Sequence, residues 1–132
     1  MEECSMFRPN FEKGGGLIRA VAQDAVSLTV LMDAYMNEEA FNETVRTGQV
    51  VYFSRSKGKL WRKGEESGNM QIVRDIRVNC YTDSTLILAE QVGGAACHEG
   101  YPTCYYRHLA NGELVLIEER VFDPSLIYKK GE

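Results

Sequence analysis

Long apolar runs are missing from this sequence, which has no stretch of about eighteen such residues and therefore no expected membrane span. The N-terminus carries neither a basic nor an apolar segment, so we expect no secretory signal and place the protein in the cytoplasm. Basic residues are not in excess, since the net charge is -4 and the pI is near 5.3. This balance argues against a broad nucleic-acid surface. Linkers, repeats and low-complexity runs are also lacking.

What remains is the composition of a soluble globular protein, with 44% hydrophobic and 26% charged residues. A chain of 132 residues has room for one domain with a single core. We expect residues 1–16 to form a loosely held lead-in, which ends in three consecutive glycines.

Strand patterns dominate the rest of the chain. Apolar and β-branched runs predict strands over residues 17–21, 28–32, 49–54, 70–81 and 85–92. A helix is predicted between Asn37, a good N-cap, and Gly48, a C-terminal stop. Residues 103–109 and 113–122 resemble a hairpin around Asn111-Gly112, and residues 123–128 a last helical turn. We therefore expect an α+β fold, mainly a β mixed sheet or pseudo-barrel with one or two capping helices.

Four cysteines in a cytoplasmic chain are seldom disulfides, which leaves metal ligands, a nucleophile or small buried side chains. Cys80, Cys97 and Cys104 are separated by sixteen and then six residues, and His98 follows Cys97 directly. A catalytic zinc site keeps three protein ligands and one open position, which fits three thiolates. Two alternatives stand beside it: free cysteines, and a structural site with His98 as fourth ligand. Adjacent residues rarely reach one ion together, which weighs against the latter.

Basic residues concentrate over residues 55–63, at Arg55, Lys57, Lys59, Arg62 and Lys63. In an acidic protein this cluster suggests an anionic ligand such as a phosphate group. Equally, it suits a solvated hairpin whose charges keep an edge strand soluble. Trp61, the only tryptophan, offers either a stacking face for a purine or ordinary core packing.

Several stretches together resemble one enzyme family. They are residues 31–37 (Leu-Met-Asp-Ala-Tyr-Met-Asn), 52–56 (Tyr-Phe-Ser-Arg-Ser), 60–65 (Leu-Trp-Arg-Lys-Gly-Glu), 67–68 (Ser-Gly), Gln71, 97–100 (Cys-His-Glu-Gly) and 104–107 (Cys-Tyr-Tyr-Arg). Their order and type are similar to the phosphoribosyl-AMP cyclohydrolase family of histidine biosynthesis. The resemblance covers roughly residues 17–107, and residues 108–132 follow as a C-terminal strand and tail.

The resemblance implies a homodimeric enzyme that opens the adenine ring of phosphoribosyl-AMP between nitrogen 1 and carbon 6. It implies a zinc ion held by Cys80 of one subunit with Cys97 and Cys104 of the other. His98, directly after Cys97, is expected to act as the nearby general base. The substrate-binding residues expected are Ser54, Arg55, Lys57, Trp61, Arg62, Lys63, Glu65, Ser67 and Gln71.

One segment departs from the family pattern. Where the family has Asp-Cys-Asp-x-Asp for a magnesium ion, this chain has Asn79-Cys80-Tyr81-Thr82-Asp83. Magnesium prefers anionic oxygen ligands, so one carboxylate with an amide and a phenol is a poor set for it. Two alternatives follow: a zinc-only hydrolase of a related phosphorylated purine-like heterocycle, or a non-catalytic, zinc-stapled dimeric binding protein.

Overall fold

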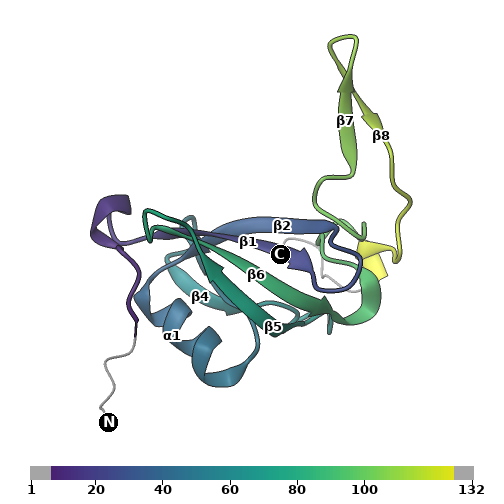
Figure 1. Cartoon of the computed structure of the whole chain (residues 1–132). Coiled ribbons are helices and arrows are strands. Elements are labelled where there is room, and N and C mark those ends of the chain that lie inside the picture. Colours follow the sequence, from purple (N-terminus) through teal and green to yellow (C-terminus); the bar gives the residue numbers. More distant parts are fainter. Residues whose placement is uncertain (1–6, 127–132) are drawn as a thin grey trace.

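A computed structural model describes residues 7–126 of the chain, and the expected α+β class is confirmed. A six-stranded mixed sheet curls into a half-barrel, and one α-helix lies against it (Figure 1). Within the described residues, no helix has the length and apolarity needed to cross a membrane.

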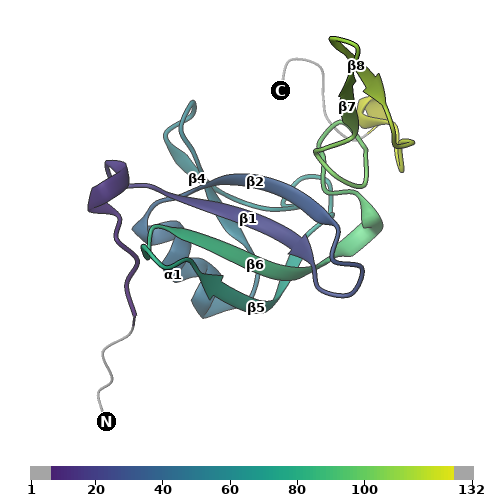
Figure 2. The same cartoon turned by 45° about the horizontal axis from the view of Figure 1, so that its top comes forward.

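The sheet brings together strands that are distant in sequence. In sheet order they are β4 (Lys59–Arg62), β3 (Val51–Ser54), β2 (Val30–Met36), β1 (Ile18–Asp24), β6 (Ser84–Gln91) and β5 (Gln71–Val78). Only the pair β1 and β6 is parallel, and the other neighbours are antiparallel. The chain before β3 also bonds to β5, since the Val50 amide donates to the Gln71 carbonyl at 3.0 Å. This contact draws the outer strands of the sheet toward each other (Figure 2).

The helix α1 (Glu38–Thr47) begins and ends where the sequence predicts. The Asn37 side chain accepts a hydrogen bond from the Ala40 amide at 2.8 Å, which caps the first turn. Gly48 ends the helix with φ of 75°, a left-handed conformation that favours glycine. Phe41 is buried on the face that the helix turns to the sheet.

The core lies between the concave side of the sheet and α1. In β1, the buried Ile18, Ala20 and Ala22 alternate with more exposed residues, as expected for a strand with one covered face. Buried residues of the other elements complete the core: Met36, Phe41, Val50, Tyr52, Ile87 and Ala89.

Residues 7–16 are packed more firmly than the loosely held lead-in that the sequence suggests, and residues 1–6 lie outside the described part. Phe11 is buried, with its ring centroid 6.3 Å from that of Phe41. Arg8 forms an ion pair with Glu38 at 2.7 Å, just before the short helix η1 (Glu12–Gly14). This segment is thereby fastened to α1.

A two-stranded hairpin stands away from the sheet (Figure 1). Its strands are β7 (Arg107–Ala110) and β8 (Glu113–Leu116), shorter than predicted but joined by the expected Asn111-Gly112 turn. Both turn residues have positive φ, 53° and 80°, as a tight hairpin turn requires. The remaining short helices are η2 (Val92–Gly94) and η3 (Pro124–Leu126); the latter lies within the predicted final turn, of which residues 127 and 128 are outside the described part.

Candidate active site

A cavity of about 840 Å³ lies between the β3–β4 hairpin and the loop that follows β6. Most of the residues proposed from sequence line it: Ser54, Lys57, Trp61, Arg62, Lys63, Glu65, Ser67, His98 and Cys104. These side chains come from segments up to fifty residues apart, so the fold assembles them into one space.

Two of the three predicted metal ligands, Cys97 and Cys104, lie close together at this cavity. Cys104 is exposed and lines the cavity, whereas Cys97 is buried and does not line it. The two thiols are close enough for Cys97 to raise the pKa of Cys104. The loop holding them is tied to β2, because the Cys104 amide donates to the Leu31 carbonyl at 2.7 Å. Gly100, with φ of 93°, allows the turn between them, where a β-carbon would overlap the Phe122 carbonyl oxygen.

A buried lysine lies close to these thiols. The Lys63 ammonium donates to the carbonyl of Ala96, the residue before Cys97. Burial lowers the pKa of Lys63, and the two nearby thiols raise it in part. Desolvation and then the adjacent Cys97 raise the pKa of Cys104 to about 12, against the opposing effect of Lys63. The donor set is therefore a thiol pair with a cation beside it, which fits a soft metal such as zinc.

Cys80 lies at the opposite end of the sheet. It is exposed in the turn before β6, whereas Cys97 and Cys104 follow β6. Seven residue steps along that strand span roughly 23 Å, while ligands of one zinc ion lie about 4 Å apart. Accordingly, residues 7–126 contain no cluster of three or more candidate metal-binding side chains within a single chain.

The turn that carries Cys80 holds its polar side chains in contacts within the chain. The Asn79 side-chain oxygen accepts from the Asp83 and Ser84 amides at 2.9 and 3.0 Å, and its nitrogen donates to the Asp83 carboxylate at 2.7 Å. The Lys13 ammonium pairs with the other Asp83 oxygen at 3.0 Å and lies 4.3 Å from the Tyr81 ring centroid. Asn79 and Lys13 lower the pKa of Asp83. The Asn79 and Asp83 side-chain oxygens therefore all have partners within the chain, and the nearby cation is a lysine.

Some residues of the basic stretch 55–63 line the cavity, and others do not. Lys57 and Lys59 are exposed at the cavity mouth, at the tip of the β3–β4 hairpin. Arg62 lines the cavity but donates to Thr47 Oγ1 at 3.3 Å, so its guanidinium is partly held by α1. Arg55 does not line the cavity, because its guanidinium lies over the Tyr35 ring, 4.1 Å from the centroid. The hairpin tip is therefore the part best suited to an anionic group.

Trp61 combines the two roles that its sequence leaves open. Its ring packs on Tyr52 with centroids 5.1 Å apart, and it also lines the cavity.

Gln71 does not line the cavity. It is fully buried, accepts from the Tyr52 hydroxyl at 2.6 Å and donates to Gln91 at 2.9 Å, so it is a core residue.

His98 is exposed at the cavity edge, with its Nε2 atom 3.4 Å from Glu99 Oε2. Glu99 also lines the cavity and pairs with Arg120 at 3.6 Å. Sequence reasoning did not assign Glu99 a role, although it stands next to His98 in the family motif. Pro124 and Ser125 also line the cavity, and no sequence signal pointed to this tail.

Comparison with known proteins shows the family of this chain. The family model for phosphoribosyl-AMP cyclohydrolase matches residues 32–106. Proteins named phosphoribosyl-AMP cyclohydrolase, a hydrolase, are similar over most of their length. That of Oleidesulfovibrio alaskensis is 54% identical over 93% of this chain and 95% of its own. That of Methanosarcina barkeri is 56% identical over 86% and 85%. The chain therefore belongs to the phosphoribosyl-AMP cyclohydrolase family.

Proposed function

We propose that this protein hydrolyses phosphoribosyl-AMP, opening its adenine ring between nitrogen 1 and carbon 6, as a step of histidine biosynthesis. The observation that carries this proposal is the single cavity in which Cys104, His98, Trp61 and the basic hairpin tip meet. A phosphorylated purine nucleotide has a flat ring, a phosphate and a site of attack, and the cavity offers a counterpart for each. Family membership supports the same substrate.

We place one zinc ion with each Cys97–Cys104 pair and take its third ligand from Cys80 of a second subunit. The adjacent thiols supply two ligands, and the exposed Cys80 is free to face another chain. Zinc bound by three protein ligands leaves a position for water and lowers the pKa of that water. Reduced thiols are needed for this site, which fits the expected cytoplasmic location.

The other cavity residues position the substrate and move protons. His98 accepts a proton from the attacking water, because an imidazole can act as a general base and this side chain lines the cavity. Lys57 and Lys59 hold the phosphate at the cavity mouth, and Trp61 offers its ring to the purine.

Magnesium is not required in this proposal. The Asn79 amide bonds to Asp83, and the Lys13 ammonium already neutralises that carboxylate. The same turn favours a second candidate function, that of a zinc-only hydrolase acting on a related phosphorylated purine-like heterocycle. The third candidate is a dimeric binding protein that zinc holds together and that catalyses no reaction.

Turnover of synthetic phosphoribosyl-AMP by zinc-quantified protein separates these candidates. We expect ring opening with close to one zinc per chain, and no gain when magnesium is added. Tight binding of the nucleotide without product would contradict catalysis and leave the binding protein. Turnover only of another phosphorylated purine would select the zinc-only alternative.

A further inference from the structure

A chain of side-chain hydrogen bonds leads from the tyrosine behind Trp61 to the far side of the sheet. The Tyr52 hydroxyl donates to Gln71 Oε1 at 2.6 Å, and Gln71 Nε2 donates to Gln91 Oε1 at 2.9 Å. Gln91 Nε2 donates in turn to the Asn69 carbonyl at 2.8 Å. Tyr52 and Gln71 are fully buried. Because water does not reach these two groups, each depends on the next residue of the chain for its hydrogen bond.

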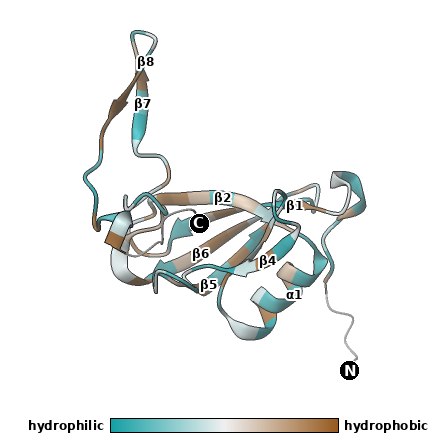
Figure 3. Cartoon of the chain, turned by 180° about the vertical axis from the view of Figure 1, so that it is seen from behind, coloured by the Kyte–Doolittle hydropathy of each residue, from teal (hydrophilic) through white to brown (hydrophobic). Residues whose placement is uncertain are grey.

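This chain of bonds joins the two sides of the curled sheet. Gln71 and Gln91 are registered partners of β5 and β6, whereas Tyr52 lies in β3, near the other edge. The strand β6 is apolar from residue 86 to residue 89, brown in Figure 3, and ends at Gln91. Together with the backbone bond from Val50 to Gln71, the Tyr52–Gln71 bond therefore closes the sheet on itself.

Tyr52 transmits this constraint to the tryptophan of the cavity. Tyr52 and Trp61 are registered partners of β3 and β4, and their ring planes are 36° apart. Trp61 is half-buried and lines the cavity. If the Gln71 amide were removed, the buried Tyr52 hydroxyl would lose its partner, and the ring would have to move to find another. The orientation of the Trp61 ring in the cavity therefore depends on Gln71.

We infer that Gln71 is a positioning residue, which holds the Tyr52 ring by its hydroxyl and thereby sets the Trp61 ring that receives the purine. The inference rests on the proposed function, in which Trp61 offers its ring to the base. Gln71 does not touch the nucleotide itself, because it is fully buried in the core. Aromatic contacts depend on the angle and offset of the two rings, so a displaced Trp61 ring binds the purine less well.

The fluorescence of Trp61 tests this inference directly, because Trp61 is the only tryptophan of the chain. Tyr52→Phe, Gln71→Met and the double variant are compared in the full chain by their emission and by quenching with AMP. We expect each single variant to shift the emission maximum and to raise the dissociation constant of AMP about fivefold, the effect of losing one hydrogen bond. The double variant should bind no more weakly than Gln71→Met, because both changes remove the same link.

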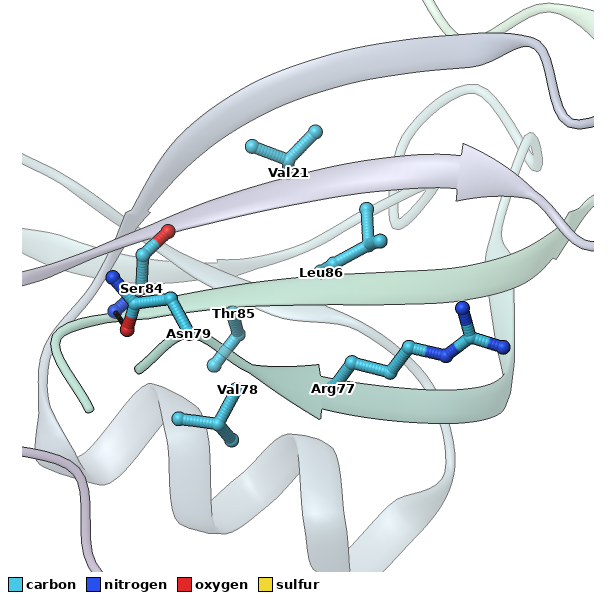
Figure 4. Close-up of a pocket in the computed structure, with 7 residues that line it drawn as sticks. All are labelled: Val21, Arg77, Val78, Asn79, Ser84, Thr85 and Leu86. Atoms are coloured by element: carbon cyan, nitrogen blue, oxygen red, sulfur yellow. Dashed lines mark hydrogen bonds between the residues drawn. The ribbon is translucent and has the colours of Figure 1, made fainter. Parts of the chain in front are cut away.

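Thr85→Val is the matched control. Thr85 is 2% exposed, but it lies at the other end of β6 from Gln91, in a second hollow of about 350 Å³ (Figure 4). Its hydroxyl donates to the Arg19 carbonyl at 3.4 Å, so the variant also loses a buried hydroxyl. We expect it to keep the emission maximum and the AMP affinity of the unmodified protein, even where its Tm falls. A purely structural role of Gln71 would lower Tm without changing the fluorescence of Trp61 or AMP binding.

An unchanged emission maximum or an unchanged AMP affinity in both Tyr52→Phe and Gln71→Met would overturn the inference, and so would additive losses in the double variant. If Gln71→Met fails to fold, as circular dichroism would show, Gln71→Asn takes its place, since its shorter side chain withdraws the amide from Tyr52. If AMP does not quench the unmodified protein, the purine role of Trp61 in the proposed function fails. The emission of the ligand-free variants then still decides whether Gln71 positions the ring.

Discussion

The two ends of β6 carry cysteines in opposite environments. Beyond its C-terminal end, Cys97 is buried and lies close to Cys104, with the Lys63 ammonium nearby. Before its N-terminal end, Cys80 is exposed in a turn stabilised by Asn79 and Asp83. The first region has a cavity but only two thiols, and the second has one thiol and a polar turn.

This contrast is what the proposed shared zinc site would need, because the thiol pair lies at the cavity and the single thiol is exposed. If zinc joins Cys80 of one subunit to the pair of another, metal binding and assembly are linked, because a ligand stabilises whichever state binds it.

Removing one thiol of the pair has the largest expected effect. Cys97→Ser or Cys104→Ser should lose zinc and bring turnover to the assay background, because two of three ligands lie in this loop. Elemental analysis and turnover measure both. Cys4→Ser, at a position outside the described residues and the matched family region, is the control and should change neither. Full zinc content in Cys104→Ser would refute the site.

Mixing two inactive variants tests whether the two regions meet across subunits. Cys80→Ser and Cys97→Ser should each be inactive alone. After subunit exchange, half of the dimers are mixed, and each has one intact site, so about a quarter of the unmodified activity should return. No recovery, although exchange is shown by native mass spectrometry, would mean that Cys80 does not complete the partner's site.

Lys63→Met should weaken zinc binding roughly tenfold, since the variant loses a charged hydrogen bond and the cation beside the thiols. Competition with a chromogenic chelator measures the affinity. Lys57→Met, which removes a lysine at the cavity mouth, is the control and should bind zinc normally. Equal affinity in both variants would show that Lys63 does not support the thiol pair.

A smaller effect is expected from pH at the Cys80 turn. Because Asn79 and Lys13 depress the pKa of Asp83 in the folded state, the ionised carboxylate stabilises the fold at neutral pH. That contribution is present above the unfolded pKa of about 3.9 and is lost as pH falls through the folded pKa. Lys13→Met should therefore lower Tm slightly at pH 7, and the difference from the unmodified protein should shrink near pH 3. A difference as large at pH 3 as at pH 7 would contradict the ion pair.

Magnesium should have no effect on the unmodified protein. Turnover after mild chelation of weakly bound cations should be unchanged when magnesium returns, whereas the double variant Asn79→Asp with Tyr81→Asp should gain magnesium binding through three carboxylates. Isothermal titration measures the binding. A magnesium requirement in the unmodified protein would show that Asp83, water and substrate phosphate suffice for the ion.

Short sequence patterns predicted the helix and strands well. They predicted only some of the residues that line the cavity. Asn37 and Gly48 marked the helix ends because capping chemistry acts within one turn. Gln71 was assigned to the ligand because a sequence does not show which face of a strand meets the cavity, and the structure places it in the core. Lys63 was expected to bind the substrate or to lie on a solvated hairpin, yet it is buried and its ammonium donates to the carbonyl of Ala96, a residue far away in the chain. Such contacts depend on how the loop after β6 folds back, which periodicity does not encode.

The parallel pairing of β1 and β6 also has a consequence for how the protein folds. It joins Arg19 to Ser84, which are sixty-five residues apart, whereas β1–β2 and β3–β4 are close in sequence. Closing so long a loop is slow compared with forming neighbouring hairpins, so β6 is expected to join the sheet late. Both cysteine regions flank this strand. At the proposed shared site, zinc uptake should therefore begin only after this central strand is in place and two subunits have met, so its time course would report the end of folding and assembly together.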